Sequence, residues 1–189
     1  MKTVIAFALA TLLTTTPFAD PTGEPQYKHT VIKNHGGIVV LPDAAQQPKK
    51  NSKVILDITA DKVEGGVILG LDRAALILNE YTEAGVGIDN GFKMAIILHG
   101  AATKAALSHE GYAKHTDSYK TDLGKTNNPN LELIQELKKA GVNIYVCGQA
   151  LAHHGYATSE VAPDVKVAVS AATVNINVQM DGYAYIPFN

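Results

Sequence analysis

The sequence predicts an α/β fold: a three-layer α/β/α sandwich with a five-stranded parallel sheet and an N-terminal extension. Two observations predict it. Five short apolar runs alternate along the chain with segments whose apolar residues recur at helical spacing. The runs are apolar almost throughout, which is typical of parallel strands covered on both faces. Right-handed crossovers then place helices on both sides of the sheet, although the strand order does not follow from the pattern.

Each strand is expected where an apolar run is bounded by polar or turn residues. The expected strands are 53–59, 92–98, 142–148, 165–171 and 183–188, with a further short strand at 38–41 in the extension. Exposed apolar edges need cover. Strand 38–41 and the final strand are therefore expected to be sheet edges or interface elements.

Helices are expected between these strands. The predicted segments are 69–85, a short helix within 101–116, 128–141, 150–155 and 172–182. Most end at a glycine, the residue that most readily follows a helix end in the left-handed conformation. Asn128 and Pro129 have the order of a cap and a first helical residue, and Asn79 is expected on the surface of the first helix. The glycine-rich stretch 61–70 lacks the spacing of a phosphate-binding loop and is expected to be a flexible connection.

The N-terminus has the features of a secretory signal peptide over residues 1–19. Lys2 precedes an apolar run at 4–13, and small residues follow up to Ala19. The run is too short to span a bilayer, and a buried first strand is the alternative interpretation. Removal of the signal would leave a periplasmic protein without membrane attachment. Residues 20–52 then form an extension or linker, and 53–189 form the domain.

Composition excludes several classes of function. Apolar residues make up 46% of the chain, enough for one domain with a full core. The formal net charge is −2 with no basic block, so no nucleic-acid partner is expected. Neither an HExxH nor a CxxC spacing occurs, so no metal site and no cofactor are predicted.

A candidate site lies beyond the carboxyl ends of the strands, where ligands gather in open parallel sheets. The residues expected at this edge are Thr59, Ala60, His99, Gly100, Cys147, Gly148 and Ser170. Cys147 is the single cysteine and stands at the start of a predicted helix, where unpaired N–H groups favour a thiolate. A buried, inert cysteine is the alternative, since cysteine is among the residues most often buried.

Neighbouring residues complete the predicted site. Gly148 would allow a close approach of the backbone, and Gln149 could donate to an anion or a persulfide. His99 could orient or protonate a sulfur species if its strand lies beside that of Cys147. His153 and His154 are expected at a partly exposed helix end, too far along it to pair with Cys147.

Several segments together resemble the DsrE/DsrF-like family, and its exported branch in particular. They are VNIYVCGQAL, NPNLELIQELKKAG, MAIILHGAAT, KVAVSAATVNI and GYAYIPF, preceded by GGIVVLPDA. The resemblance implies a parallel five-stranded α/β/α domain that assembles into homotrimers or hexamers. It also implies that Cys147 alone accepts a sulfane sulfur as a persulfide, and that His99, which matches the family's HG position, has a supporting role. Gly100, Gly148 and Gln149 are expected to stabilise the anion or persulfide because of their place at this edge.

The leading functional hypothesis is therefore a periplasmic sulfur-handling protein that accepts sulfur on Cys147 and passes it to another thiol. Its donor and acceptor, and whether it turns over as a sulfurtransferase, are left open. Two alternatives remain. One is a non-catalytic oligomeric protein that binds a small ligand and has a structural cysteine. The other is a thiol redox sensor, in which Cys147 is oxidised or pairs between subunits.

Overall fold

The computed structural model describes residues 25–116 and 127–189, and it contains the predicted parallel sheet. The order of its strands is β6-β5-β4-β1-β7, and every neighbouring pair is parallel. The strands are β1 (Lys53–Ile58), β4 (Lys93–Leu98), β5 (Asn143–Cys147), β6 (Lys166–Ala168) and β7 (Ala184–Phe188). The signal-peptide prediction falls on residues 1–19, which lie outside the described residues.

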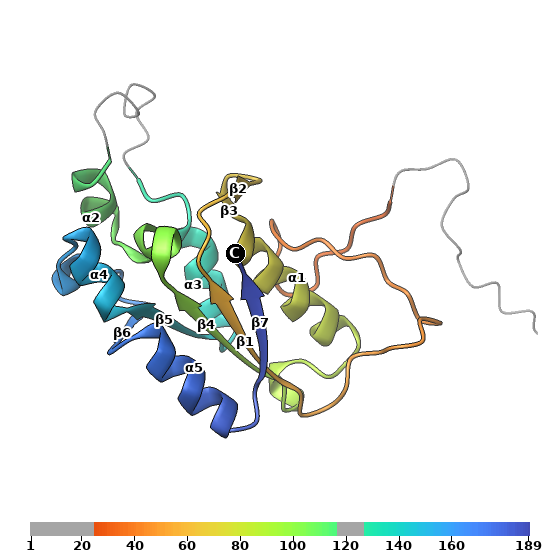
Figure 1. Ribbon diagram of the computed structural model, residues 1–189. Helices are drawn as coiled ribbons and strands as arrows, with labels where there is room; N and C mark the ends of the chain where they lie inside the picture. The colour runs from red at the N-terminus through yellow and green to blue at the C-terminus, as the bar shows by residue number, and fades with distance from the viewer. Residues whose placement is uncertain (1–24, 117–126) are drawn as a thin grey trace, which may run out of the picture.

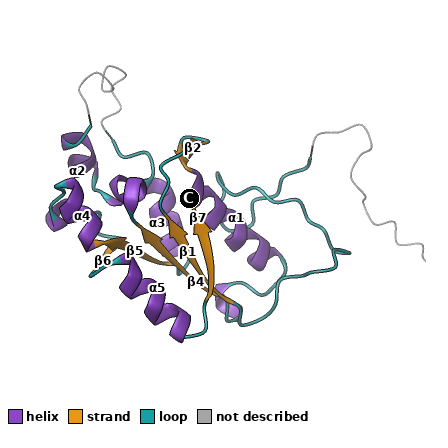
Figure 2. Ribbon diagram, in the orientation of Figure 1, coloured by secondary structure: helices purple, strands orange, loops and turns teal. Residues whose placement is uncertain are grey.

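Helices cover both faces of the sheet, which confirms the predicted three-layer fold (Figure 1). Helices α1 (Leu69–Glu83) and α3 (Leu131–Lys139) pack on one face, and α5 (Ala171–Met180) packs on the other. The remaining helices are α2 (His109–Lys114), α4 (Gly148–His154) and the 3-10 helices η1 (Ile88–Asn90), η2 (Gly100–Ala106) and η4 (Thr158–Glu160). Figure 2 shows that loops join these helices to the strands.

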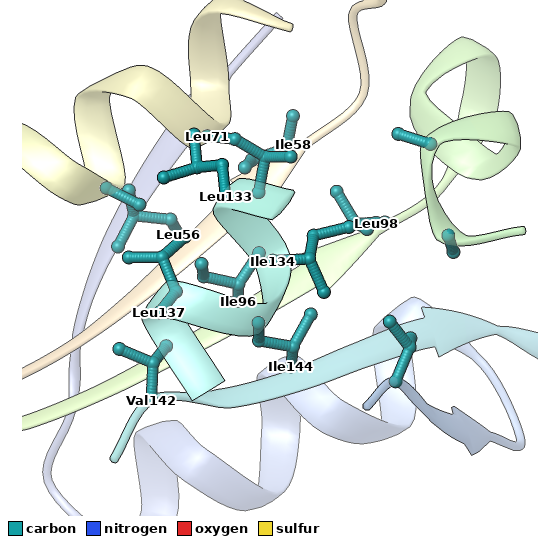
Figure 3. Close-up of a cluster of buried hydrophobic side chains, with 14 of the residues drawn as sticks. Leu56, Ile58, Leu71, Ile96, Leu98, Leu133, Ile134, Leu137, Val142 and Ile144 are labelled. Atoms are coloured by element: carbon teal, nitrogen blue, oxygen red, sulfur yellow. The ribbon is translucent and has the colours of Figure 1, made fainter. Parts of the chain in front are cut away.

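The main core lies between the sheet and the α1–α3 layer (Figure 3). Alternate residues of the central strands point into it, because side chains alternate between the two faces of a strand. The labelled side chains are Leu56, Ile58, Leu71, Ile96, Leu98, Leu133, Ile134, Leu137, Val142 and Ile144. The intervening positions Ile55, Ala95 and Ile97 face α5 and form a second, smaller cluster. The central strands β1 and β4 are thus buried on both faces, as their composition predicts, whereas the edge strands β6 and β7 are largely exposed.

The predicted helix ends agree with the structure. Four glycines that follow helices have positive φ: Gly85, Gly141, Gly155 and Gly182. Helix α3, however, begins at Leu131 rather than at Pro129. The Asn128 side chain is buried and donates to Ala105 O (2.9 Å) and Leu107 O (2.6 Å). Because Asn128 holds this neighbouring loop, the helix starts after it.

Two further predictions about local structure were wrong. Residues 61–70 contain a β-hairpin, with β2 (Val63–Glu64) antiparallel to β3 (Val67–Ile68). Gly65 and Gly66 both have positive φ, the conformation that a tight two-residue hairpin turn requires. Residues 38–41 form no strand, and Ile38 makes only an isolated bridge to Lys28. The sheet edges are accordingly β7, as expected, and β6.

The extension is attached to α1 by Asn79, which is fully buried and not on the surface as expected. Its Oδ1 accepts hydrogen bonds from Val31 N (2.8 Å) and Ile32 N (2.9 Å). Its Nδ2 donates to Ile32 O (3.1 Å), His35 O (3.2 Å) and Gly36 O (3.0 Å). One side chain thereby satisfies five backbone groups of the extension, and Ile32 joins the main core.

Candidate functional site

The candidate site lies at the carboxyl edge of the sheet, where β5 ends at Cys147 and β4 is followed by His99. The two strands are neighbours, and Leu98 pairs with Val146. His99 and Cys147 each follow one residue of this last pair, and the His99 backbone stays extended, with its N–H donating to Ile58 O of β1 (3.1 Å). The structure therefore places His99 beside Cys147 at the same level of the sheet.

Cys147 is the N-cap residue of α4. Its Sγ accepts a hydrogen bond from Ala150 N (3.4 Å), and the residue is 6% exposed. Its apolar neighbours are those of the smaller cluster: Ile55, Ala95, Ile97, Ala171 and Val174. The thiol is therefore at the site edge but largely enclosed under α5.

Gly148 and Gln149 both face β6 and the loop that follows it. A Cβ on Gly148 would lie 2.8 Å from Ala168 O, so the glycine is required for α4 to pack against this strand. The Gln149 side chain is exposed and its Nε2 donates to Val169 O at 3.4 Å. The close approach predicted at Gly148 is thus an approach to protein backbone.

Gly100 adopts φ +57° directly after His99, and its carbonyl oxygen accepts two hydrogen bonds. They come from Thr103 Oγ1 (2.7 Å) and His154 Nε2 (3.0 Å). His154 and His153 are both exposed, as predicted for a helix end. Through His154, α4 contacts the turn that carries His99. At the far end of the edge, Ser170 caps α5 by accepting a hydrogen bond from Thr173 N (3.0 Å).

The structure adds three polar residues that sequence reasoning missed: Asp57, Asn175 and Tyr185. Asp57 is 6% exposed, and its Oδ1 lies 2.5 Å from His99 Nε2. Its Oδ2 accepts hydrogen bonds from Asn175 Nδ2 (2.9 Å) and Tyr185 Oη (2.7 Å). The hydrogen bond to Asp57 raises the pKa of the Tyr185 phenol, so the hydroxyl remains a donor.

A sequence signal for Asp57 was present. The carboxylate interrupts the apolar run KVILDI, and a charge in a strand buried on both faces requires partners. Asn175 and Tyr185 carry no comparable signal, because each lies in an element whose orientation the pattern does not define.

A second polar cluster lies nearby, around Glu160. Its carboxylate accepts hydrogen bonds from Lys114 Nζ (2.5 Å) and contacts His115 Nε2 (2.8 Å). These hydrogen bonds, and one from Ala157 N, lower the pKa of Glu160 to about 2. The cluster joins α2 to η4.

The described residues contain no group of three or more histidine, cysteine or acidic side chains arranged to hold a metal ion. Within the same residues, no helix is both long enough and apolar enough to cross a membrane.

A model of the DsrE/DsrF-like family matches residues 53–188. Among solved structures, the chain is similar to a protein of unknown function, MTH1491, from Methanobacterium thermoautotrophicum. The identity is 17% and the TM-score 0.46, over 72% of this chain and 99% of that chain. No curated protein matches the chain. Because the family model covers most of the chain, including all five strands of the sheet, the protein belongs to the DsrE/DsrF-like family.

Proposed function

We propose that the protein handles sulfane sulfur on Cys147. The Cys147 thiolate attacks a sulfane sulfur, holds it as a persulfide and releases it to another thiol. The DsrE/DsrF-like family is associated with sulfur relay, which supports the general chemistry. The observation that carries the proposal is the position of the single cysteine at the carboxyl edge, as N-cap of α4 and beside His99.

The contact between Ala150 N and Cys147 Sγ directs one backbone donor at the sulfur. A neutral thiol is a weak hydrogen-bond acceptor. An ionised acceptor forms the stronger bond, and a helix start adds partial positive charge. The same features would stabilise a persulfide anion at the start of α4.

A second candidate is a non-catalytic ligand-binding protein in which Cys147 is structural. The burial of Cys147 at 6% exposure, among apolar side chains, favours this alternative. The two candidates differ in one measurable property, which is whether reagents reach the thiol in the folded protein.

Alkylation of Cys147 in the folded protein, measured against pH and followed by mass, tests the proposal. A poised acceptor is alkylated well below pH 8.5, about where a free cysteine ionises. It also gains one sulfur atom from polysulfide. Cys147→Ser provides the control, because it must show neither reaction. If alkylation requires denaturant and no sulfur is gained, the sulfur-handling proposal is wrong and Cys147 is structural. A Cys147-dependent dimer on a non-reducing gel would instead indicate a redox sensor.

We further propose that the protein is exported to the periplasm and assembles as a homo-oligomer. Residues 1–19 carry the signal-like pattern that supports export. Exposed apolar side chains on β6 and directly after it support assembly, since Val167 is 44% exposed and Val169 is 70% exposed. The mass of the exported protein and its size by light scattering test these two points. An uncleaved N-terminus would exclude processing of the signal, and a monomer would exclude assembly.

A further inference from the structure

The carboxylate of Asp57 is the centre of a polar cluster drawn from four elements: β1, β7, α5 and the end of β4. Its other members are His99, Asn175 and Tyr185. Both carboxylate oxygens have partners, and the apolar residues Ile55 and Ile97 lie on the same face of the sheet. A buried carboxylate that accepts hydrogen bonds at both oxygens has one orientation, so Asp57 is a fixed anchor for His99.

The contact with Asp57 determines which ring nitrogen of His99 is left to exchange protons. Nε2 lies against Asp57 and carries the hydrogen that this contact requires. Across residues 25–116 and 127–189, Nδ1 has no hydrogen-bond partner, and the side chain is 26% exposed. Nδ1 is therefore the nitrogen that can take up a proton and return it.

The strand register brings His99 and Cys147 to the same edge of the sheet. Side chains at the same level of adjacent parallel strands lie on the same face, with strands about 4.8 Å apart. Ile97 and Cys147 both face α5, and His99 follows Ile97 by two residues. His99 therefore shares the face on which Cys147 lies, and no hydrogen bond joins the two side chains in the described structure.

We propose that His99 is the proton carrier for sulfur transfer at Cys147, with Asp57, Tyr185 and Asn175 as its positioning residues. This inference rests on the proposed function. Nδ1 of His99 takes the proton of the Cys147 thiol, and the thiolate attacks the outer sulfur of a donor persulfide, R–S–SH. A new S–S bond forms to Cys147 as the donor S–S bond breaks. The leaving thiolate R–S⁻ then receives the proton from Nδ1, so Cys147–SH and R–S–SH become Cys147–S–SH and R–SH without net oxidation.

The charges around His99 suit this role. Asp57 from β1 faces Nε2 and stabilises the imidazolium that forms during transfer. Tyr185 from β7 and the neutral Asn175 from α5 reach the imidazole only through Asp57, and Cys147 ends β5, the strand next to β4. On the other side, His154 from α4 contacts Gly100 O and not the imidazole.

The test measures sulfur loading of Cys147 from two donors, glutathione persulfide and an aryl persulfide, across pH. An aryl thiolate leaves without a proton, whereas a glutathione thiolate gains from protonation. His99→Gln should slow loading from glutathione persulfide by roughly 10²- to 10⁴-fold. In the same variant, loading from the aryl donor should fall far less at high pH, where the Cys147 thiolate forms without a base.

The positioning residues are tested in the same assay. Asp57→Asn should show the donor-dependent defect of His99→Gln, and Tyr185→Phe a smaller one. Tyr185→Phe keeps the buried charge, so it remains informative if Asp57→Asn does not fold. His153→Gln, an exposed histidine on α4, is the control and should load both donors at the wild-type rate.

The outcomes separate this inference from the function on which it rests. A wild-type protein that loads from neither donor overturns the sulfur-handling proposal itself. A wild-type protein that loads, with His99→Gln slowing both donors equally or neither at high pH, where the Cys147 thiolate is already formed, overturns the proton carrier alone. A defect confined to glutathione persulfide, whose leaving thiolate is the more basic, supports the proton carrier. A structural fault at Cys147 would instead slow loading from both donors.

Discussion

Replacement of Asn79 by alanine should release the N-terminal extension while the sheet stays folded. The side chain makes five hydrogen bonds to extension backbone. At about 1 kcal/mol net for each bond, their loss amounts to about 5 kcal/mol. Release also exposes the buried side chains of Ile32 and Ile38, which opposes opening by about 3–6 kcal/mol in wild type and variant alike and cancels in the difference between them. We therefore expect the free energy of local opening to fall by about 3–5 kcal/mol.

Hydrogen exchange of the Val31 and Ile32 amides measures this opening directly. Protection of both amides should fall roughly 10²- to 10⁴-fold, since each 1.4 kcal/mol corresponds to a factor of ten. Trypsin should also cleave more readily after Lys33, which is exposed beside these residues. Asn177→Ala, an exposed asparagine on α5, is the matched control. Unchanged protection of the Val31 and Ile32 amides in Asn79→Ala would refute the argument that Asn79 holds the extension.

Two further predictions concern stability. Gly36→Ala should lower the thermal midpoint, because Gly36 has φ +62° and an added Cβ would lie 2.1 Å from Leu76 N. Gly65→Ala is the control for backbone strain, because Gly65 has φ +60° but open space around it. An equal fall of the thermal midpoint in both variants would show that the clash at Gly36 is unimportant. The pKa of Glu160 is lowered from 4.5 to about 2, so its contribution is complete above pH 4.5 and is lost as pH falls toward 2. In urea titrations, the free energy of unfolding of wild type should exceed that of Glu160→Gln above pH 4.5, and this difference should disappear as pH falls toward 2. A difference that stays constant with pH would contradict the lowered pKa of Glu160.

The fold class was predictable because it depends on patterns that are local in the chain. Apolar runs and helical spacing identified the five strands of the sheet and the helices packed on it, and glycines identified the helix ends. Strand order was not predictable, since it depends on contacts between residues far apart in the sequence. The strand expected at 38–41 did not form, because an isolated apolar run has no partner strand to pair with at that place.

The site was predictable only in part for the same reason. Cys147 and His99 end predicted strands, so the topology alone placed both at the carboxyl edge. The partners of Asp57 are distant, with Tyr185 lying 128 residues further along the chain. The prediction for Asn79 failed for a different reason. It lies four residues after Ala75 on the buried face of α1, but its polar side chain led to a surface assignment.

Because the extension packs on α1, the folded domain begins earlier in the chain than the match to the family model. Sequence similarity to the family covers residues 53–188, yet the main core is completed by Ile32 from outside that range. Expression of residues 53–188 alone would expose the apolar surface that Ile32 covers. It would also leave the buried Asn79 side chain without its hydrogen-bond partners. The region that matches the family model is therefore smaller than the unit that folds here, and expression of the folded domain should begin before Lys28 rather than at Lys53.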